Sequence, residues 1–391
     1  MKITKIECKP VSLPFAKPIV MSHGPVVCAH AVLLILHTDE GITGYAESGD
    51  TSVFYMGESQ DSIFYNISQM FGPHILLGED PFNIETILAK MDKAAKLNYQ
   101  SKALVDYALH DLMGKALGVP VYKLLGGKSN PKIKLAYVMS SGTPEEVAGQ
   151  AKKLVEAGYG GVKLKVGDNV IEDDIRMVAE VRNAVGKDVH IITDTNGGWN
   201  YFQALKFLQQ VREYDLYLAE QPIPRWDIDG LARLRRKVET PIFADEAAGE
   251  IHDLIKLVQK DAVDGLFLKI PKAGGIRKSQ RWVATAQSMG LNVMCGCMIN
   301  SGLGAAGEAH FLTATEWMGK MANESIGPLN LHDLVDTTGP AVKDDLGKTM
   351  PRYENGYLYP PEGPGLGIEL NEEAVEKYAT PGKSPVVLTL R

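Results

Sequence analysis

Beyond residue 131, short apolar runs alternate with amphipathic stretches at a regular pace, and this alternation constrains the fold more than any other feature. The apolar runs occupy 133–139, 161–166, 189–194, 216–220, 241–245, 265–270 and 291–297, and an eighth is expected near 324–331. Helical patterns such as 169–185 and 201–213 follow them. Such alternation indicates parallel strands, and eight units favour a closed barrel over an open, doubly wound sheet. No GxGxxG motif opens the series, which argues against a dinucleotide-binding fold.

The segments on either side of this series have different patterns. Residues 1 to about 50 read as strands, and a helical pattern runs from about 58 to 118, which together make an α+β unit. The tail is rich in Pro, Gly and Tyr and is expected to pack back against this unit. We therefore predict an α/β protein with a (β/α)₇β-type TIM barrel and an α+β capping domain formed by the N-terminal region and the C-terminal tail. The predicted boundaries are 1–128 for the N-terminal capping region, 129–345 for the barrel and 346–391 for the tail.

Charged residues stand at the ends of five consecutive apolar runs, where a strand should finish. Lys165, Asp194, Glu220, Asp245 and Lys269 are separated by 29, 26, 25 and 24 residues, about one strand–helix unit each time. In a barrel of this kind the strand ends share one face, the face that carries active sites. A single Asp after a strand is often only a helix cap, and Glu220 alone could lie in a plain turn. Five charged ends in register are harder to explain that way, so we expect the side chains to converge.

Three converging carboxylates cannot all stay ionised without a cation. Asp194, Glu220 and Asp245 offer only oxygen atoms, a donor set that selects a hard divalent ion, Mg²⁺ first and Mn²⁺ next. No histidine accompanies them, which disfavours zinc. Asn196 lies on the same side of the chain as Asp194 and is expected to support the site.

The two lysines come from the second and sixth strands of eight, so they should face each other across the ring with the acidic strands between them. A substrate carboxylate held at the metal would then have Lys165 on one face of its α-carbon and Lys269 on the other. The ion withdraws charge, and a lysine removes the α-proton to give an enediolate. Lys163 shares a strand face with Lys165 and is expected to help keep Lys165 partly neutral, the form that a base needs.

The overall composition is that of a globular chain, and it excludes several classes of function. The chain has 391 residues, 45% of them hydrophobic, and a net charge of −7, so no nucleic-acid partner is expected. No run reaches the apolar length of a membrane span, and we expect no signal peptide. The four cysteines have neither zinc-binding nor redox spacing. We expect a cytoplasmic homo-oligomer.

Several motifs together resemble a known family. They are Lys163-Leu164-Lys165, Asp194-Thr195-Asn196, Glu220-Gln221-Pro222, Asp245-Glu246, Lys269-Ile270-Pro271-Lys272-Ala273-Gly274-Gly275 and the tail motif Gly363-Pro364-Gly365-Leu366-Gly367-Ile368-Glu369. They look like the enolase superfamily and, within it, the muconate lactonizing enzyme subgroup, over nearly the whole chain. The resemblance implies that the three acids are the metal ligands, that Lys165 and Lys269 are the acid/base pair, and that Lys163 is an auxiliary lysine beside the substrate carboxylate.

Other positions are candidates for substrate contact by the same resemblance. Many members carry a glutamate where this chain has Asn300. Dipeptide epimerases often show paired aspartates near the eighth strand for an ammonium group, and this chain keeps at best Asp336. His23 and Tyr55 fall in predicted capping loops, and Trp226 falls just past the fourth strand. We expect these side chains to line the substrate site and to favour a partly apolar substrate.

We therefore expect a Mg²⁺-dependent enzyme that abstracts the proton α to the carboxylate of a small molecule. Lysines on both faces suit racemisation or epimerisation of an amino acid or an N-substituted amino acid. The same pair could serve a cycloisomerase of the muconate lactonizing type, or a lyase of the dehydratase or o-succinylbenzoate synthase type. A non-catalytic barrel that binds a metal or carboxylate is the alternative from another class, but binding alone needs no buried lysines.

Overall fold

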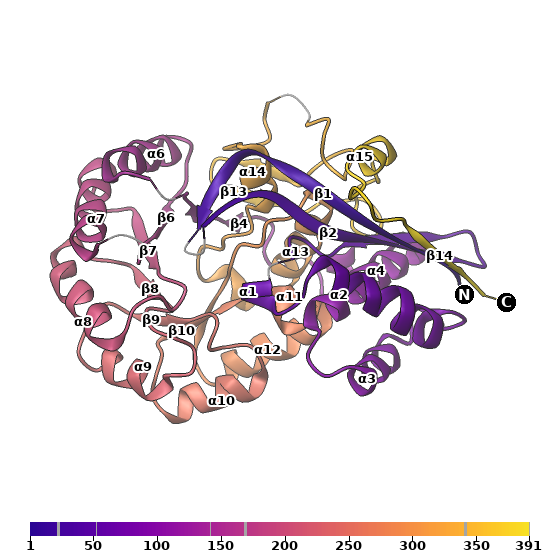
Figure 1. The fold of residues 1–391 in the computed structure, drawn as a ribbon, viewed down its shortest axis with the longest axis horizontal. Helices are drawn as coiled ribbons and strands as arrows, with labels where there is room; N and C mark the ends of the chain where they lie inside the picture. The colour runs from indigo at the N-terminus through magenta and orange to yellow at the C-terminus, as the bar shows by residue number, and fades with distance from the viewer. Residues whose placement is uncertain (22–23, 52, 141, 168–169, 340–341, 391) are drawn as a thin grey trace.

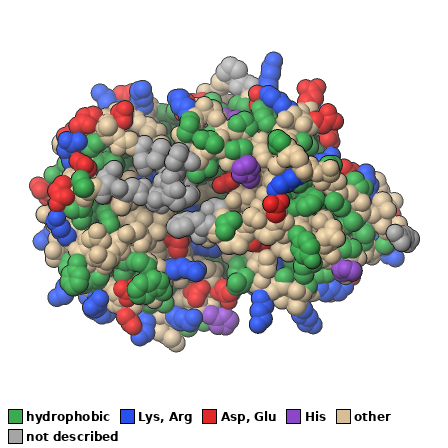
Figure 2. All heavy atoms as spheres, viewed as in Figure 1, with side chains coloured by type: hydrophobic (Ala, Val, Ile, Leu, Met, Phe, Trp, Pro, Cys, Tyr) green, Lys and Arg blue, Asp and Glu red, His purple; other side chains and the backbone are tan. Residues whose placement is uncertain are grey.

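The computed structural model describes residues 1–391 except 22–23, 52, 141, 168–169, 340–341 and 391. A ring of parallel strands wrapped by helices forms one side of the molecule, and a long antiparallel sheet with its own helices lies against it (Figure 1). Figure 2 shows acidic and basic side chains mixed over the same face, in keeping with the small net charge of −7. Among the described residues, no helix has the length and apolar character that crossing a membrane requires.

The antiparallel sheet has four strands in the order β14-β1-β2-β3. They are β1 (Ile3–Met21), β2 (Gly24–Thr38), β3 (Thr43–Glu47) and β14 (Val386–Thr389). β1 and β2 form a long hairpin whose register shifts between Pro14 and Ile19. An irregularity at that place accommodates proline, which cannot donate a hydrogen bond to the ladder. β14 pairs with residues 5–8 of β1, so the C-terminal tail completes the sheet that the N-terminal region begins, as predicted.

Helices that follow β3 pack on this sheet and complete the capping region. They are α1 (Val53–Met56), α2 (Gln60–Tyr65), the π-helix η1 (Asn66–Leu76), α3 (Ile84–Ala94), α4 (Tyr99–Leu117) and α5 (Val121–Leu124). α4 is buried over most of its length and contacts both β2 and β3. It ends at Gly118, whose φ of 66° is the left-handed conformation that glycine adopts most easily.

Seven parallel strands form a continuous sheet in the order β11-β10-β9-β8-β7-β6-β5. They are β5 (Tyr137–Val138), β6 (Gly161–Lys165), β7 (His190–Asp194), β8 (Leu218–Glu220), β9 (Ile242–Ala244), β10 (Gly265–Leu268) and β11 (Asn292–Cys295). Each strand lies inside one of the predicted apolar runs. Most of their residues are buried, which is typical of parallel strands covered by helices on the outside.

Asn323 and Glu324 fill the eighth position of the ring. Asn323 pairs in parallel with Leu135, just before β5, and the Glu324 amide donates to the Cys295 carbonyl at the end of β11 over 2.8 Å. This short segment therefore joins the two edges of the sheet. The predicted run over 324–331 is wrong in extent, because α14 (Gly327–His332) occupies most of it. Pro328 lies in the first turn of this helix, where the φ angle of proline suits a helix.

The barrel helices form the outer layer seen in Figure 1. They are α6 (Pro144–Glu156), α7 (Ile171–Val185), α8 (Tyr201–Gln210), the 3₁₀ helix η2 (Arg212–Tyr214), α9 (Ile228–Arg235), α10 (Ile251–Gln259), α11 (Ile270–Ala273), α12 (Ile276–Ser288), α13 (Gly302–Ala314) and the 3₁₀ helix η3 (Glu316–Gly319). Capping boxes define several starts, for example Thr143 with Glu146 at α6. The other elements are β4 (Ile133–Lys134), β12 (Arg352–Glu354), β13 (Tyr357–Tyr359) and α15 (Glu372–Lys377), and the three strands form a small sheet in the order β12-β13-β4.

The capping region and the barrel meet closely where α13 packs near α4. α13 is buried along its whole length. A Cβ atom at Gly307 of α13 would lie only 1.8 Å from Cε1 of the Tyr107 ring in α4. The close approach of the two helices therefore depends on the missing side chain at Gly307, since the ring belongs to a packed core and cannot easily move.

Two glycine-to-alanine substitutions in helices should have opposite effects on stability. Gly307→Ala should lower the free energy of unfolding by about 1–3 kcal/mol, because the new methyl group overlaps the Tyr107 ring. Gly149→Ala in α6 is the matched control, since a Cβ there meets nothing within 4 Å. It should raise the free energy of unfolding by up to about 1 kcal/mol through helix propensity. Urea titrations followed by circular dichroism measure both, and equal effects of the two changes would contradict the packing described here.

Candidate active site

Five neighbouring strands bring the predicted charged residues to one end of the barrel. Lys165 of β6 lies opposite Asp194 of β7, and Asp194 lies opposite Glu220 of β8. Asp245 directly follows β9, and Lys269 directly follows β10. The two lysines are therefore four strands apart in the sheet, with the three acid-bearing strands between them.

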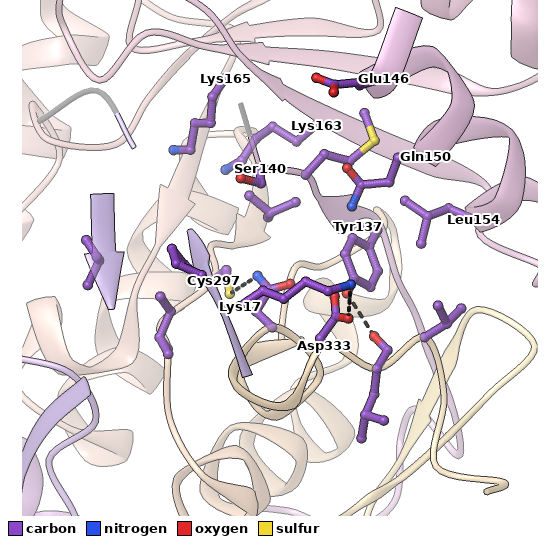
Figure 3. Close-up of a pocket in the computed structure, with 18 of the residues that line it drawn as sticks. Lys17, Tyr137, Ser140, Glu146, Gln150, Leu154, Lys163, Lys165, Cys297 and Asp333 are labelled. Carbon is purple, nitrogen blue, oxygen red and sulfur yellow. Dashed lines mark hydrogen bonds and ion pairs between the residues drawn. The ribbon is translucent and has the colours of Figure 1, made fainter. Parts of the chain in front are cut away.

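A cavity of about 810 Å³ lies at this end, between the barrel and the capping sheet. Lys163, Lys165 and Lys269 line it from the barrel side. Figure 3 shows the first two extending side by side, while Lys17 of β1 forms an ion pair with Asp333 in another part of the wall. Much of the remaining wall is apolar and comes from Val26, Tyr137, Met139, Leu154, Ile299 and Leu334.

The lysines of β6 bind the acids of the next two strands. Lys165 Nζ lies 2.6 Å from Asp194 Oδ2, and Lys163 Nζ lies 2.8 Å from Glu220 Oε2. Lys163 Nζ also lies 2.5 Å from Oε2 of Glu324. Burial alone would lower the pKa of Lys163, but the charges of Glu220 and Glu324 raise that pKa above its ordinary value. The carboxylates of Glu220 and Glu324 thus hold Lys163 in place. That Lys163 helps keep Lys165 partly neutral stays a prediction.

The pKa values of the neighbouring acids move in opposite directions. Burial acts to raise the pKa of Asp194, but Lys165 and Lys163 outweigh it and hold that pKa below its ordinary value. Burial and the adjacent charge of Asp194 raise the pKa of Glu220. The two carboxyl groups therefore lie in different electrostatic environments, although their strands are neighbours.

Asp245 is held by two ammonium groups. Lys269 Nζ lies 2.9 Å from Asp245 Oδ2, and Lys272 Nζ lies 2.5 Å from Oδ1 and 2.6 Å from the Asp245 carbonyl. Burial acts to raise the pKa of Asp245, but these two lysines lower it. Burial also opposes the charged form of Lys269, but Asp245 and Glu220 raise its pKa above the ordinary value. Lys269 Nζ lies 3.7 Å from the centroid of the Tyr55 ring, so a cation–π contact fixes it from the capping side.

The predicted ligands Asp194, Glu220 and Asp245 are buried carboxylates at the ends of adjacent strands. In the part of the chain that the structure describes, no three acidic, histidine or cysteine side chains are gathered so that they could hold an ion as they stand, and each of these carboxylates is ion-paired with a lysine. Glu220 Oε1 is nevertheless buried with no hydrogen-bond partner among the described residues. Such an oxygen requires a partner, and the all-oxygen donor set is the kind that Mg²⁺ or Mn²⁺ prefers.

Glu324 is a member of this cluster that the sequence did not reveal. It is buried at the eighth position of the ring, where its carboxylate binds Lys163. Burial outweighs the effect of Lys163 and raises the pKa of Glu324 to about 7. The residue was missed because the eighth run was expected to extend from 324 to 331, which leaves Glu324 at its start and not at its end.

Lys272 and Glu246 also belong to the cluster, although in the sequence they stand out only as parts of the family motifs. Lys272 lies three residues past Lys269 in α11 and so returns to the same side of the chain. Glu246 follows Asp245 directly, and its Oε1 accepts a hydrogen bond of 2.9 Å from Asn196 Nδ2. Both residues could have been found from their spacing to the predicted site residues.

The candidates for substrate contact differ in their position relative to the cavity, and one of the described candidates lines it. Tyr55 lines the cavity, whereas Asn300, Trp226 and Asp336 are not among the described residues that line it. Asn300 is turned away because its Nδ2 donates to Glu308 Oε1. Trp226 is 78% exposed, and Asp336 Oδ1 accepts hydrogen bonds within its own turn. Substrate contact by these three residues stays a prediction. His23 lies outside the described residues.

Comparison with known proteins matches the chain to two models of one family. Residues 3–126 match the mandelate racemase/muconate lactonizing enzyme N-terminal domain, and residues 146–374 match the enolase C-terminal domain-like family.

Individual relatives agree with these matches. A mandelate racemase/muconate lactonizing family protein from Azoarcus sp. EbN1 superposes with a TM-score of 0.94 at 49% identity, over 100% of both chains. The N-succinyl-L-Arg/Lys racemase of Bacillus cereus is 32% identical over 96% of this chain and 98% of its own. A dipeptide epimerase from Enterococcus faecalis, solved with Mg and the dipeptide L-Leu-L-Tyr, superposes with a TM-score of 0.84 at 30% identity, over 94% of this chain and 100% of its own.

Replacing Lys163 with Met should destabilise the protein strongly. Glu220 and Glu324 would then share a buried site without the ammonium group that binds both of them. Removing one partner of a buried ion pair costs about 3–5 kcal/mol in the free energy of unfolding. Urea unfolding of the protein in EDTA measures the loss.

Lys206→Met is the matched control for this change. Lys206 pairs over 2.7 Å with Glu172, a residue whose side chain is 67% exposed. A surface pair of this kind contributes about 0–1 kcal/mol, so the control should unfold close to the parent protein. Equal losses in the two variants would show that the buried cluster does not depend on Lys163.

Proposed function

The chain belongs to the mandelate racemase/muconate lactonizing enzyme family of the enolase superfamily, and we propose that it is a Mg²⁺-dependent racemase or epimerase of N-substituted amino acids. The observation that carries this proposal is the position of Lys165 and Lys269 on one cavity, four strands apart, with the strands of the three acids between them. Proton removal from one face alone needs only one of these amines as a base. Two amines on opposite strands suit a reaction that inverts a carbon centre.

Lys165 and Lys269 act as the acid and the base. Nζ of one lysine takes the α-proton from one face of the substrate, and Nζ of the other gives a proton to the opposite face, which inverts the configuration. The two exchange roles in the reverse direction. Each amine has a carboxylate within hydrogen-bonding distance, Asp194 for Lys165 and Asp245 for Lys269, which orients it before the substrate binds.

Asp194, Glu220 and Asp245 would hold Mg²⁺, with Mn²⁺ as the alternative ion. When bound, the ion supplies positive charge that stabilises the negative charge developing on the substrate carboxylate as the proton leaves. Lys163, buried against Glu220, supplies a further positive charge at the same end of the cavity. The Mg in the Enterococcus faecalis epimerase structure supports this choice of ion.

The size and lining of the cavity favour an N-substituted amino acid over a free one. Its volume of about 810 Å³ lies in the upper part of the range of roughly 300–1,000 Å³ common for ligand sites. A free amino acid would fill only a small part of it. The apolar side chains of Val26, Met139, Leu154 and Ile299 suit an acyl group or a large side chain. The name of the Bacillus cereus relative, a racemase of N-succinyl amino acids, supports the same class.

Two other outcomes could use the same lysine pair. A cycloisomerase of the muconate lactonizing type, which the family description includes, needs one amine to stabilise the enolate as a cation while the other moves the proton. A lyase of the dehydratase or o-succinylbenzoate synthase type needs the same division of roles. The products distinguish them, because a cycloisomerase makes or opens a ring and a lyase makes a new double bond.

Incubation of N-succinyl and N-acetyl L-amino acids with the protein and Mg²⁺ in D₂O should replace the α-proton by deuterium and produce both enantiomers. Proton NMR follows the exchange, and chiral chromatography follows the inversion. EDTA should abolish both reactions and added Mg²⁺ should restore them. Lys165→Ala and Lys269→Ala should each lower racemisation by about 10²–10⁴-fold, since each removes one of the two bases.

The surface change Lys206→Ala should leave both rates unchanged, because Lys206 pairs only with exposed Glu172. A ring product or a new alkene in place of the second enantiomer would assign the chain to the cycloisomerases or the lyases. A folded protein that binds Mg²⁺ but exchanges the α-proton of none of these acids and forms no product from them would contradict the catalytic proposal and favour the non-catalytic barrel.

A further inference from the structure

Glu246 occupies a place that the proposed reaction does not by itself explain. It follows Asp245 at the end of β9 and reaches past β8 to the residues after β7. Its Oε1 accepts a hydrogen bond of 2.9 Å from Asn196 Nδ2. Its other oxygen, Oε2, is buried with no hydrogen-bond partner among the described residues.

Asn196 connects Glu246 to Lys165. Its Oδ1 accepts a hydrogen bond of 2.9 Å from Lys165 Nζ, and its backbone N–H donates to Asp194 Oδ1 over 2.8 Å. The backbone has a φ of 48°, a left-handed conformation that Asn tolerates better than most residues. This conformation lets one residue contact the acid, the lysine and Glu246 together.

Glu246 decides which way the Asn196 amide faces. Oε1 of Glu246 accepts from the amide NH₂ group of Asn196, and this leaves the amide oxygen facing Lys165. In the opposite orientation the NH₂ group would face the ammonium group, and two donors would meet without an acceptor. The contact between Asn196 and Lys165 therefore depends on an acceptor at position 246.

We propose that Glu246 is a positioning residue for Lys165 and that it acts through the amide of Asn196. The inference rests on the proposed function, in which Lys165 moves the α-proton on one face of the substrate. Asp194, the other acceptor for Lys165 Nζ, is also a proposed metal ligand, so its carboxylate would bind the ion as well as the lysine. Within the described part of the chain, the amide oxygen of Asn196 accepts from the lysine alone and so helps to fix the position of its Nζ.

Lys269 is held in a different way. Among the described residues, its Nζ contacts Asp245 Oδ2 and the face of the Tyr55 ring, and neither contact runs through Asn196. The charge of Glu246 also favours the ammonium form of Lys269, but not through Asn196. Loss of the hydrogen-bonded link through Asn196, as in Asn196→Gly, should therefore impair Lys165 and leave the contacts of Lys269 in place. A purely structural role of Glu246 would impair both, because it would act through the stability of the whole site.

Variants at position 246 separate the hydrogen bond from the charge. Glu246→Gln removes the charge but keeps a carbonyl oxygen that can accept from Asn196, whereas Glu246→Leu removes both. Asn196→Gly removes the connecting side chain and suits the positive φ, so it serves as a second test if Glu246→Leu folds poorly.

The measurement is deuterium exchange into N-succinyl-L-arginine and N-succinyl-D-arginine, followed separately in Mg²⁺ and D₂O. The enantiomer that depends on Lys165 is the one whose exchange is abolished by Lys165→Ala. We expect Glu246→Leu and Asn196→Gly to slow exchange of that enantiomer by about 10- to 100-fold, as is common for residues that orient a catalytic group. In these two variants, the exchange rate of the other enantiomer should stay within about threefold of that in the parent protein. In Glu246→Gln, the exchange rates of both enantiomers should stay within the same limit. Equal losses for both enantiomers, or a Gln variant as slow as the Leu variant, would overturn the proposal.

Crystal structures of the same variants give a reading that does not need turnover. In Glu246→Leu the contact between Asn196 Oδ1 and Lys165 Nζ should open, while that between Lys269 and Asp245 stays, and in Glu246→Gln both should remain. An unchanged Asn196 in the Leu variant would refute the positioning role whatever the substrate. Absence of exchange in the parent protein, together with the expected structural change, would instead refute the proposed function and leave the positioning contact established.

Discussion

The burial of lysine ammonium groups against carboxylates at the mouth of the barrel is the constraint on which the rest of the structure depends. Neither kind of charge is stable in such a place alone, since an unpaired buried charge costs more than a protein can readily offset. Lys163, Lys165 and Lys269 each bind an acid that comes from a different strand. Strands β6 to β10 must therefore all be in place before all of these charges are compensated, and the same residues contribute to both the fold and the site.

The capping region contacts the end of the barrel that carries these charges. The Asp50 amide donates to the Ile299 carbonyl over 2.7 Å, and the Tyr55 ring covers Lys269. Residues of both parts of the chain line the cavity. Reactive charges at the strand ends meet apolar walls a short distance away, so the barrel can supply the chemistry while the capping side selects the substrate.

Much of this could be predicted from the sequence, because it depends on periodicity. All seven parallel strands fall inside predicted apolar runs, and the register of β6, β7 and β8 places Lys165, Asp194 and Glu220 side by side. Residues whose role depends on a rotamer or an irregular segment could not be predicted. Glu324 lies on a bridge too short to show a period, and Asn300 is drawn to Glu308 by a contact that no spacing reveals.

The crystal structure of the protein with Mg²⁺ and N-succinyl-L-arginine tests the central claim most directly. We expect one ion bound by Asp194, Glu220 and Asp245, with Nζ of Lys165 and Nζ of Lys269 on opposite faces of the substrate α-carbon. An ion bound elsewhere, or both amines on one face of that carbon, would contradict the proposed chemistry.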